Sequence, residues 1–234
     1  MIKLFLYIFP FLSLFLPSIW VNFILKKNNK ILYDMPFTGY ELGKMILEDQ
    51  KLTNVKIQSV KKLDFYNPKE KEINIGVDKI NKKSITSIAV VAHEIGHAIQ
   101  DKENYKPLII RQKLIEKTTI FQRIGSLLLI IGLPSIFTFT KSPLITFIAA
   151  IIIMGCLSTN VLIHLITLPV EFDASFKRAL PVLKKYVPKE NMQQCRSVLR
   201  AAALTYLAQS IVSIFRLKVI LFSLINIFKS IIRR

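Results

Sequence analysis

The sequence predicts an α-helical membrane protein that carries one small α+β unit. Three observations predict this class. Hydrophobic residues make up 52% of the 234 residues, and the mean hydropathy is +0.42. Four long apolar stretches lie along the chain, as in proteins with several membrane-spanning helices. One polar segment between them shows the periodicities of both helices and strands, so we expect it to fold outside the membrane.

The first apolar stretch, from Leu4 to Leu25, contains no charged residue and is followed by Lys26 and Lys27. A stretch of about 20 apolar residues is long enough to cross a bilayer. No small-residue cleavage site of the signal-peptide kind follows it. We therefore expect residues 1–25 to form an uncleaved N-terminal transmembrane anchor.

A transmembrane hairpin is expected at residues 124–168. Two apolar stretches, Gly125–Thr140 and Pro143–Leu168, are separated only by Lys141 and Ser142. Because a connection this short makes consecutive helices antiparallel neighbours, the two stretches should cross the membrane in opposite directions.

The fourth apolar stretch, from Leu204 to Phe228, is less regular because Arg216 and Lys218 lie in its middle. A charged side chain at the centre of a bilayer costs about 3 kcal/mol or more. Residues 204–234 are expected to form membrane-associated helices, and two interpretations stay open: one true span, or two shorter helices that lie along the membrane surface or pack on the other helices.

The basic residues predict the orientation in the membrane. Residues 26–123 contain 19 lysines and arginines and residues 172–203 contain seven, whereas the hairpin connection contains one. By the positive-inside rule, both basic segments lie in the cytoplasm. We expect a multi-pass protein of the plasma membrane, in contact with membrane lipid, whose segments 26–123 and 169–203 are cytoplasmic.

The net charge of +18 would also suit a protein that binds nucleic acid. The basic residues are, however, spread through segments that flank the apolar stretches, and the sequence contains no DNA- or RNA-binding motif. We therefore expect no nucleic-acid partner.

The polar segment 26–123 is expected to contain a helix, two strands and a second helix in that order. Thr38 and Glu41 have the spacing of a capping box, which predicts the start of the first helix. Three apolar residues would share one face of this helix: Leu42, Met45 and Ile46.

The first strand is expected within residues 54–60, and a turn at Asn67–Pro68 is expected to precede the second. Three residues would lie on one side of that second strand: Ile73, Ile75 and Val77. Ser84 could then cap a last helix that runs from about Ile85 to Gln100.

This last helix carries the sequence His-Glu-Ile-Gly-His at residues 93–97, which matches H-E-x-x-H. Histidines four residues apart lie on one helix face, about 40° apart around the axis, so His93 and His97 could bind the same cation. A pattern with three fixed positions also arises by chance. Here, however, it falls inside a predicted helix and takes two of the three histidines in the chain.

Zinc is the cation that this pattern favours, because imidazole nitrogens suit it and its bound water ionises near neutral pH. Glu94 would project beside the metal rather than onto it. It could act as a general base that takes a proton from the attacking water and passes it to the leaving amine.

A catalytic zinc site has three protein ligands and one open position. Glu103 is too near the motif to fold back unless the helix ends, and Glu116 lies in a charged stretch that is typical of a solvated face. His164 lies within the third apolar stretch, and Glu171 follows that stretch. Glu171 could also be a carboxylate at the N-terminus of a new helix, where the helix dipole favours negative charge. The residues alone therefore leave the third ligand open.

Three segments occur in the order "AVVAHEIGHAIQ", "TLPVEFDASFKRAL" and "AAALTYLA". With them the chain resembles, as far as about Ala208, the YugP-type neutral zinc metallopeptidases of bacterial membranes. More distantly it is similar to HtpX-type and CaaX prenyl proteases, in which the glutamate of an E-F-x-A-D segment is the third zinc ligand. The resemblance implies a zincin-like unit in which His93, His97 and Glu171 hold one Zn²⁺ per chain, the gluzincin arrangement.

This sequence departs from those better-known proteases at Ser175, where they have an aspartate. Either Ser175 or Asp173 would then orient one of the two histidines. Tyr206 could donate a hydrogen bond to the oxyanion, or it could be an ordinary interfacial aromatic residue. Arg178 could bind a substrate carboxylate or a lipid phosphate.

Together, motif and resemblance predict a membrane-bound zinc metalloendopeptidase that acts on peptide or membrane-protein substrates. Two alternatives remain: a non-catalytic membrane protein with a structural metal site, and a metal sensor or transporter. A structural site would need a fourth protein ligand. A transporter would need more polar groups along the apolar stretches than Asn160 and His164. No feature predicts the substrate or the oligomeric state.

Overall fold

The computed structural model describes residues 16–61 and 63–232. The chain divides into two compact units. What we call the polar unit contains residues 16–109 and 167–206, and what we call the helical unit contains residues 110–166 and 207–232. The prediction of an α-helical membrane protein with a small α+β unit is confirmed, since long apolar helices and one short sheet make up the described chain.

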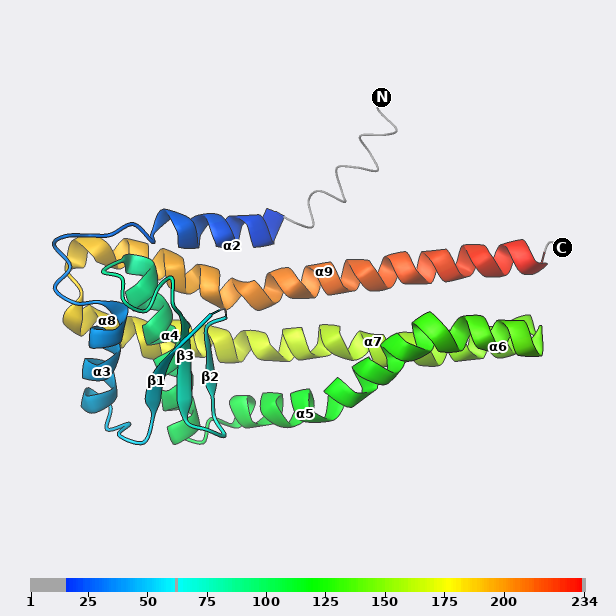
Figure 1. Cartoon of the computed structure of the whole chain (residues 1–234), viewed down its shortest axis with the longest axis horizontal. Helices are drawn as coiled ribbons and strands as arrows, with labels where there is room; N and C mark the ends of the chain where they lie inside the picture. The colour runs from blue at the N-terminus through cyan, green and yellow to red at the C-terminus, as the bar shows by residue number, and fades with distance from the viewer. Residues whose placement is uncertain (1–15, 62, 233–234) are drawn as a thin grey trace, which may run out of the picture. The chain divides into compact units, whose positions relative to one another are not determined.

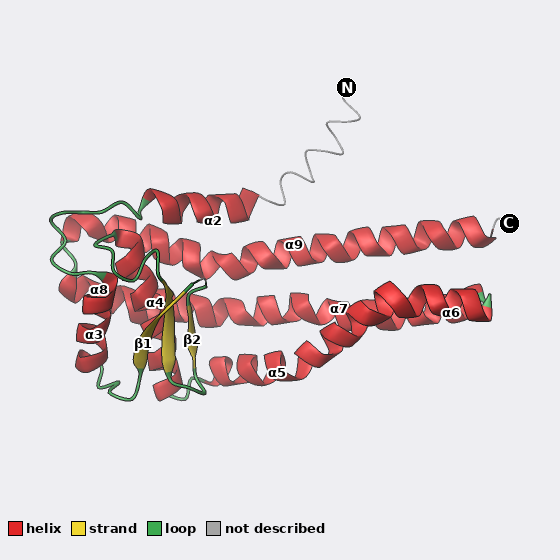
Figure 2. Cartoon of the chain, viewed as in Figure 1, coloured by secondary structure: helices red, strands yellow, loops and turns green. Residues whose placement is uncertain are grey.

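The polar unit packs helices against a small sheet, with α4 behind the strands in this view (Figures 1 and 2). Its elements from the first part of the chain are α2 (Leu16–Lys27), α3 (Gly39–Asp49), β1 (Lys56–Val60), β2 (Phe65–Asn67), β3 (Glu72–Gly76) and α4 (Ile85–Lys102). From the later part come the end of α7 (Pro143–Phe172), the π-helix η2 (Asp173–Ala179), α8 (Leu180–Tyr186), the 3₁₀ turn η3 (Lys189–Asn191) and the start of α9 (Met192–Ile232). Helix α4 contacts α3, the strands β2 and β3, η2 and α8, so it is the central element of this unit.

The sheet has the strand order β1-β3-β2, with β3 parallel to β1 and antiparallel to β2. Ile73 and Ile75 on β3 are both fully buried, which confirms their predicted inward position. The prediction for Val77 is wrong, because β3 ends at Gly76 and the Val77 side chain is 58% exposed. Strand β2 was not predicted, since its three residues take a strand conformation only by pairing with β3.

The predicted starts of both helices are confirmed. Thr38 and Glu41 form a capping box at α3, and the Ser84 hydroxyl accepts a hydrogen bond from the backbone of Ser87 at the start of α4. On α3 the predicted inward position of Met45 is wrong. Its side chain is 43% exposed, whereas Leu42 and Ile46 are buried as predicted and Leu47 is buried with them.

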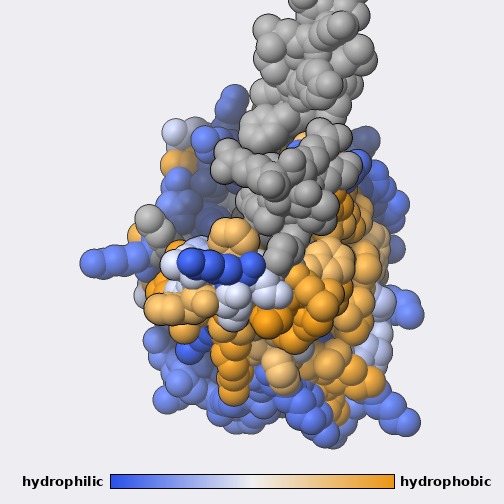
Figure 3. Space-filling model, turned by 90° about the vertical axis from the view of Figure 1, so that its right-hand side faces the viewer, coloured by the Kyte–Doolittle hydropathy of each residue, from blue (hydrophilic) through white to orange (hydrophobic). Residues whose placement is uncertain are grey.

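Three helical stretches are long and apolar enough to cross a membrane: Lys106–Thr140, Leu144–Tyr186 and Lys189–Phe222. The first joins α5 (Lys106–Leu127), the π-helix η1 (Leu128–Gly132) and α6 (Leu133–Thr140). Helix α6 ends at Thr140, its C-cap Lys141 has a φ of 49°, and α7 begins at Pro143, whereas the crossing of a membrane by this hairpin stays a prediction. Many large apolar side chains on these helices are exposed, and hydrophobic atoms gather on the face shown in Figure 3.

The last apolar stretch belongs to a single helix. Helix α9 runs without interruption through Arg216 and Lys218, so the alternative of two shorter helices is wrong. Of the predicted anchor at residues 1–25, the part before residue 16 lies outside the described residues. The remainder forms most of α2, which ends at Lys26 and Lys27.

Helix α4 and η2 approach each other closely at Gly96. A β-carbon at this position would lie 2.6 Å from the carbonyl oxygen of Ala174 and 3.2 Å from its Cα atom. Contact with backbone at such a distance cannot be relieved by a side-chain movement. Glycine is therefore required by the packing here, although it costs a helix about 1 kcal/mol relative to alanine.

Replacing Gly96 by alanine should destabilise the polar unit. Overpacking typically costs about 1–3 kcal/mol of folding stability. Because the new β-carbon would meet backbone atoms, we expect a cost near the upper end of this range. That cost exceeds the gain in helix propensity from glycine to alanine, which is about 1 kcal/mol. Gly155→Ala is the matched control, because a β-carbon there meets nothing within 4 Å. Thermal unfolding of the full-length proteins in detergent should show a lower midpoint for Gly96→Ala only. Equal midpoints for both variants would contradict the close packing.

Candidate metal centre

The two histidines of the motif lie on a helix that is buried along most of its length. All residues of α4 from Ile85 to Gln100 are buried, because the sheet, α3 and η2 surround the helix. His93 and His97 are 5% and 6% exposed, and their ring centroids lie 4.8 Å apart. The two rings are thus neighbours on one face, as their four-residue spacing predicts.

Glu171 reaches these histidines from the other part of the polar unit. It lies at the end of α7 and is 1% exposed. Its Oε2 atom is 3.1 Å from Nε2 of His93 and 3.3 Å from Nε2 of His97. Within the described part of the chain, these residues form the one group of three or more histidines, cysteines or acidic residues that could hold a metal ion. Their ligand atoms all lie within 4.8 Å of one another.

The second ring nitrogen of His93 faces a serine. Nδ1 of His93 lies 2.9 Å from the hydroxyl oxygen of Ser175 on η2. That hydroxyl donates to the backbone carbonyl of Leu199 on α9 at 3.2 Å, so its oxygen can accept a proton from Nδ1. Of the two residues that the sequence suggested for this task, Ser175 is therefore the one in direct contact with a histidine.

The second ring nitrogen of His97 faces a glutamine. Nδ1 of His97 lies 2.9 Å from Oε1 of Gln100, which is fully buried one turn further along α4. The Gln100 amide nitrogen donates to the backbone carbonyl of Val170 at 2.9 Å and to Oδ2 of Asp173 at 2.8 Å. Asp173 thus reaches His97 through Gln100, a residue that the sequence analysis did not select.

The donor set fits a zinc ion. Zinc binds imidazole nitrogen and carboxylate oxygen at about 2.0–2.2 Å, and two ligand atoms of a tetrahedral site are then about 3.3–3.5 Å apart. The distances from Glu171 Oε2 to the two Nε2 atoms, 3.1 and 3.3 Å, are close to that separation. Both Nδ1 atoms are held by protein groups on the other side, as is usual for histidines that bind metals.

Glu94 lies in the same buried region, with 6% of its surface exposed. Consecutive side chains leave a helix about 100° apart, so Glu94 lies beside the face that carries His93 and His97. Glu94 is not one of the three converging groups, and its role as a general base stays a prediction.

The other acidic candidates lie elsewhere. Glu103 is the C-cap of α4, and its Oε2 accepts a hydrogen bond from Nη1 of Arg178 at 2.6 Å. Glu116 is exposed on α5. Neither belongs to the group of converging ligand atoms. His164 lies on α7 within the helical unit.

Arg178 forms ion pairs within the polar unit, which the sequence did not suggest. Its Nε atom donates to Oδ2 of Asp173 at 2.6 Å, and only 12% of its side chain is exposed. Its contacts are thus to Asp173 and Glu103 rather than to a lipid phosphate or a substrate carboxylate. Tyr206 is partly buried on α9, and its role at the oxyanion stays a prediction.

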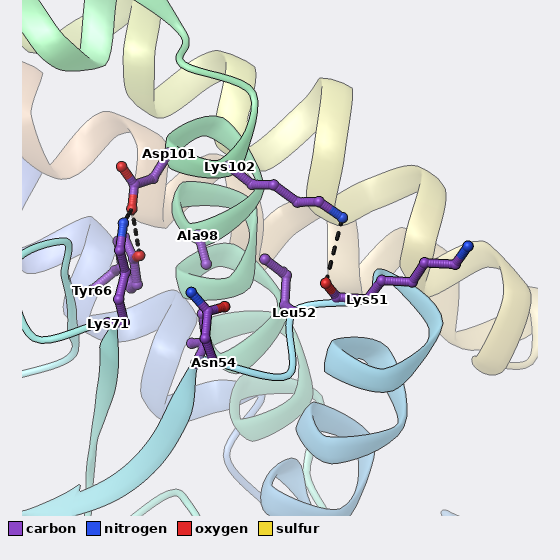
Figure 4. A pocket seen from close by; sticks show the side chains of 9 residues that line it. Lys51, Leu52, Asn54, Tyr66, Lys71, Ala98, Asp101 and Lys102 are labelled. Carbon is purple, nitrogen blue, oxygen red and sulfur yellow. Dashed lines mark hydrogen bonds and ion pairs between the residues drawn. The ribbon is translucent and has the colours of Figure 1, made fainter.

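A pocket of about 260 Å³ lies along the C-terminal half of α4. Figure 4 shows that Asp101 is the polar centre of this pocket, because Oδ2 of Asp101 accepts hydrogen bonds from Tyr66 at 2.6 Å and from Lys71 at 2.5 Å. Burial, together with the hydrogen bond to Asp101, raises the pKa of Tyr66 well above its usual range. Ala98 also lines the pocket, but His93, His97 and Glu171 do not, so it is separate from the converging ligand atoms.

Comparison with known proteins agrees with this centre. Residues 3–225 match the family described as "Putative neutral zinc metallopeptidase". "Putative membrane protease YugP" of Bacillus subtilis (strain 168) is 30% identical to this chain over 211 residues, which cover 86% of this chain and 88% of that protein. No solved structure matches the chain significantly. Because the family match covers nearly all residues, the chain belongs to this family of zinc metallopeptidases.

Proposed function

We propose that this protein is a membrane-bound zinc metalloendopeptidase of the H-E-x-x-H, gluzincin type. His93, His97 and Glu171 hold one Zn²⁺, and Glu94 is the general base. The observation that carries this proposal is the convergence of two Nε2 atoms on one carboxylate oxygen, at 3.1 and 3.3 Å, in a buried place. Family membership supports zinc as the metal.

Zinc, when bound, supplies Lewis-acid chemistry that polarises a peptide carbonyl and makes water acidic enough to ionise near neutral pH. Glu94 accepts the proton that the attacking water loses as its oxygen bonds to the carbonyl carbon. When the C–N bond breaks, Glu94 gives this proton to the amine nitrogen. The low exposure of Glu94 and of the histidines excludes bulk water, which strengthens these electrostatic interactions.

The number of ligands favours a catalytic site over a structural one. Structural zinc sites usually have four protein ligands, whereas catalytic sites have three and leave one position open. Within the described residues, the group of converging atoms comes from three side chains. This count supports an enzyme over the alternative of a structural metal site.

We infer that the enzyme lies in the plasma membrane with its active site on the cytoplasmic side. Three helices long enough to span a membrane and the membrane-protease relative support membrane association. The orientation rests on the excess of lysine and arginine in residues 26–123 and 172–203. In this position the enzyme would cleave membrane or misfolded proteins close to the bilayer surface.

Glu94→Gln should abolish proteolysis and leave zinc bound. The amide keeps the size of the side chain but cannot accept the proton, and loss of a general base lowers kcat by about 10²–10⁴-fold. Zinc content by atomic emission and cleavage of casein or a membrane-protein substrate can be measured on the same purified samples. Proteolysis that survives the substitution would rule out this mechanism.

Glu171→Ala should weaken zinc binding by more than about 100-fold, because loss of an outer-shell partner alone costs about 10–100-fold and Glu171 is proposed as a direct ligand. Glu116→Ala is the matched control, since it removes an exposed carboxylate that the sequence also offered as a candidate. Zinc retention after dialysis against a chelator gives the comparison. Equal retention by the two variants would require a different third ligand.

A further inference from the structure

We propose that Gln100 is a positioning residue that selects the tautomer of His97 and is itself fixed by Asp173. Its task is to keep the proton of the neutral imidazole on Nδ1, so that Nε2 is left with the lone pair that binds zinc. This inference rests on the proposed function, because it concerns how one of the proposed zinc ligands is prepared.

The hydrogen bonds of the Gln100 amide determine which way it points. Its nitrogen has two hydrogens, and the structure provides two acceptors for them, the carbonyl of Val170 at 2.9 Å and Oδ2 of Asp173 at 2.8 Å. The amide oxygen must therefore face Nδ1 of His97, at 2.9 Å. A carbonyl oxygen can only accept, so Nδ1 has to carry the hydrogen.

The opposite orientation of this amide is strongly disfavoured. It would turn the amide oxygen toward two acceptors, the Val170 carbonyl and Asp173 Oδ2, and both would lose the hydrogen bond that the amide nitrogen now donates. Gln100 is 0% exposed, so water cannot replace the lost partners. The orientation of the amide, and with it the hydrogen on Nδ1 of His97, is thus set by the fold, and Nε2 is the ring nitrogen that faces Glu171.

Asp173 is fixed in turn by a partly buried cation. Its Oδ2 atom accepts from Nε of Arg178 at 2.6 Å, and Nη1 of Arg178 donates to Glu103 at 2.6 Å. The side chains of Asp173 and Arg178 are 7% and 12% exposed, whereas that of Glu103 is 56% exposed. A relay of side chains therefore runs from His97 through Gln100, Asp173 and Arg178 to the surface.

His93 is held less selectively than His97. Its partner, Ser175, has a hydroxyl hydrogen that can rotate, so the same oxygen can donate or accept. The carbonyl of Leu199 favours the accepting state of this hydroxyl, but at a longer distance of 3.2 Å. Loss of Gln100 should consequently affect zinc binding more than loss of the Ser175 hydroxyl.

The test uses the full-length protein in detergent and measures zinc affinity by competition with a chelator. Gln100→Met keeps the length of the side chain and removes the amide. It should weaken zinc binding by about 10–100-fold, and Asp173→Asn should weaken it by a smaller factor. In the Gln100→Met background Asp173→Asn should add at most about a twofold change, because its effect on zinc acts through Gln100.

Ser87→Ala is the control for a merely structural role. Ser87 lies on the same helix, is also 0% exposed, and donates to the carbonyl of Lys79 at 2.7 Å, without contact to a histidine. It should lower stability without changing zinc affinity by more than about twofold. If Gln100→Met does not fold, Asp173→Asn and the spectra described next decide the matter.

The tautomer can be observed directly, because the chain has only three histidines. In nitrogen NMR spectra of the zinc-loaded protein, His97 should show a protonated Nδ1, and the hydrogen on this atom should exchange with water faster in Asp173→Asn. A zinc affinity of Gln100→Met within twofold of the unmodified protein, or an unprotonated Nδ1 in that protein, would overturn the inference alone. An unmodified protein that binds no zinc would overturn the proposed function as well.

Discussion

The polar unit depends on holding a buried carboxylate against two buried imidazoles. Glu171 is 1% exposed and lies 3.1 and 3.3 Å from the Nε2 atoms of His93 and His97. A carboxylate is stable in such a place only if positive charge and hydrogen-bond donors replace its water. The surrounding packing serves this requirement, because Gly96 lets η2 approach α4 and so brings the end of α7 to the histidines.

Local patterns in the sequence predicted the helix starts, which depend on contacts between residues that are neighbours in the chain. Thr38 and Ser84 begin the helices that they were expected to begin, since a cap depends on neighbouring residues. Positions that depend on distant parts of the chain were missed. Strand β2 exists through pairing with β3, and the exposure of Met45 and Val77 depends on which elements pack nearby. Helix α9 continues through Arg216 and Lys218, because a charged side chain makes burial in lipid costly but does not interrupt the hydrogen bonds of a helix.

The same distinction applies to the site. The spacing of His93 and His97 predicted a shared face, whereas Glu171 is separated from His93 by 78 residues, and only the resemblance selected it among several candidate ligands. Gln100 had a local signal, because a residue three positions after a histidine lies on nearly the same helix face. Its importance follows from Val170 and Asp173, which no local pattern connects to it. Ser175 contacts His93 directly, whereas Asp173 acts on His97 through Gln100.

The central claim is that two imidazoles and one carboxylate of this chain hold a zinc ion. X-ray absorption at the zinc edge, on the full-length protein purified in detergent, tests this claim most directly. The account predicts a first shell of nitrogen and oxygen atoms at about 2.0–2.2 Å, with the scattering pattern of two imidazole rings. A sulfur atom at about 2.3 Å, which would implicate Cys156 or Cys195, or fewer than two imidazoles, would contradict it.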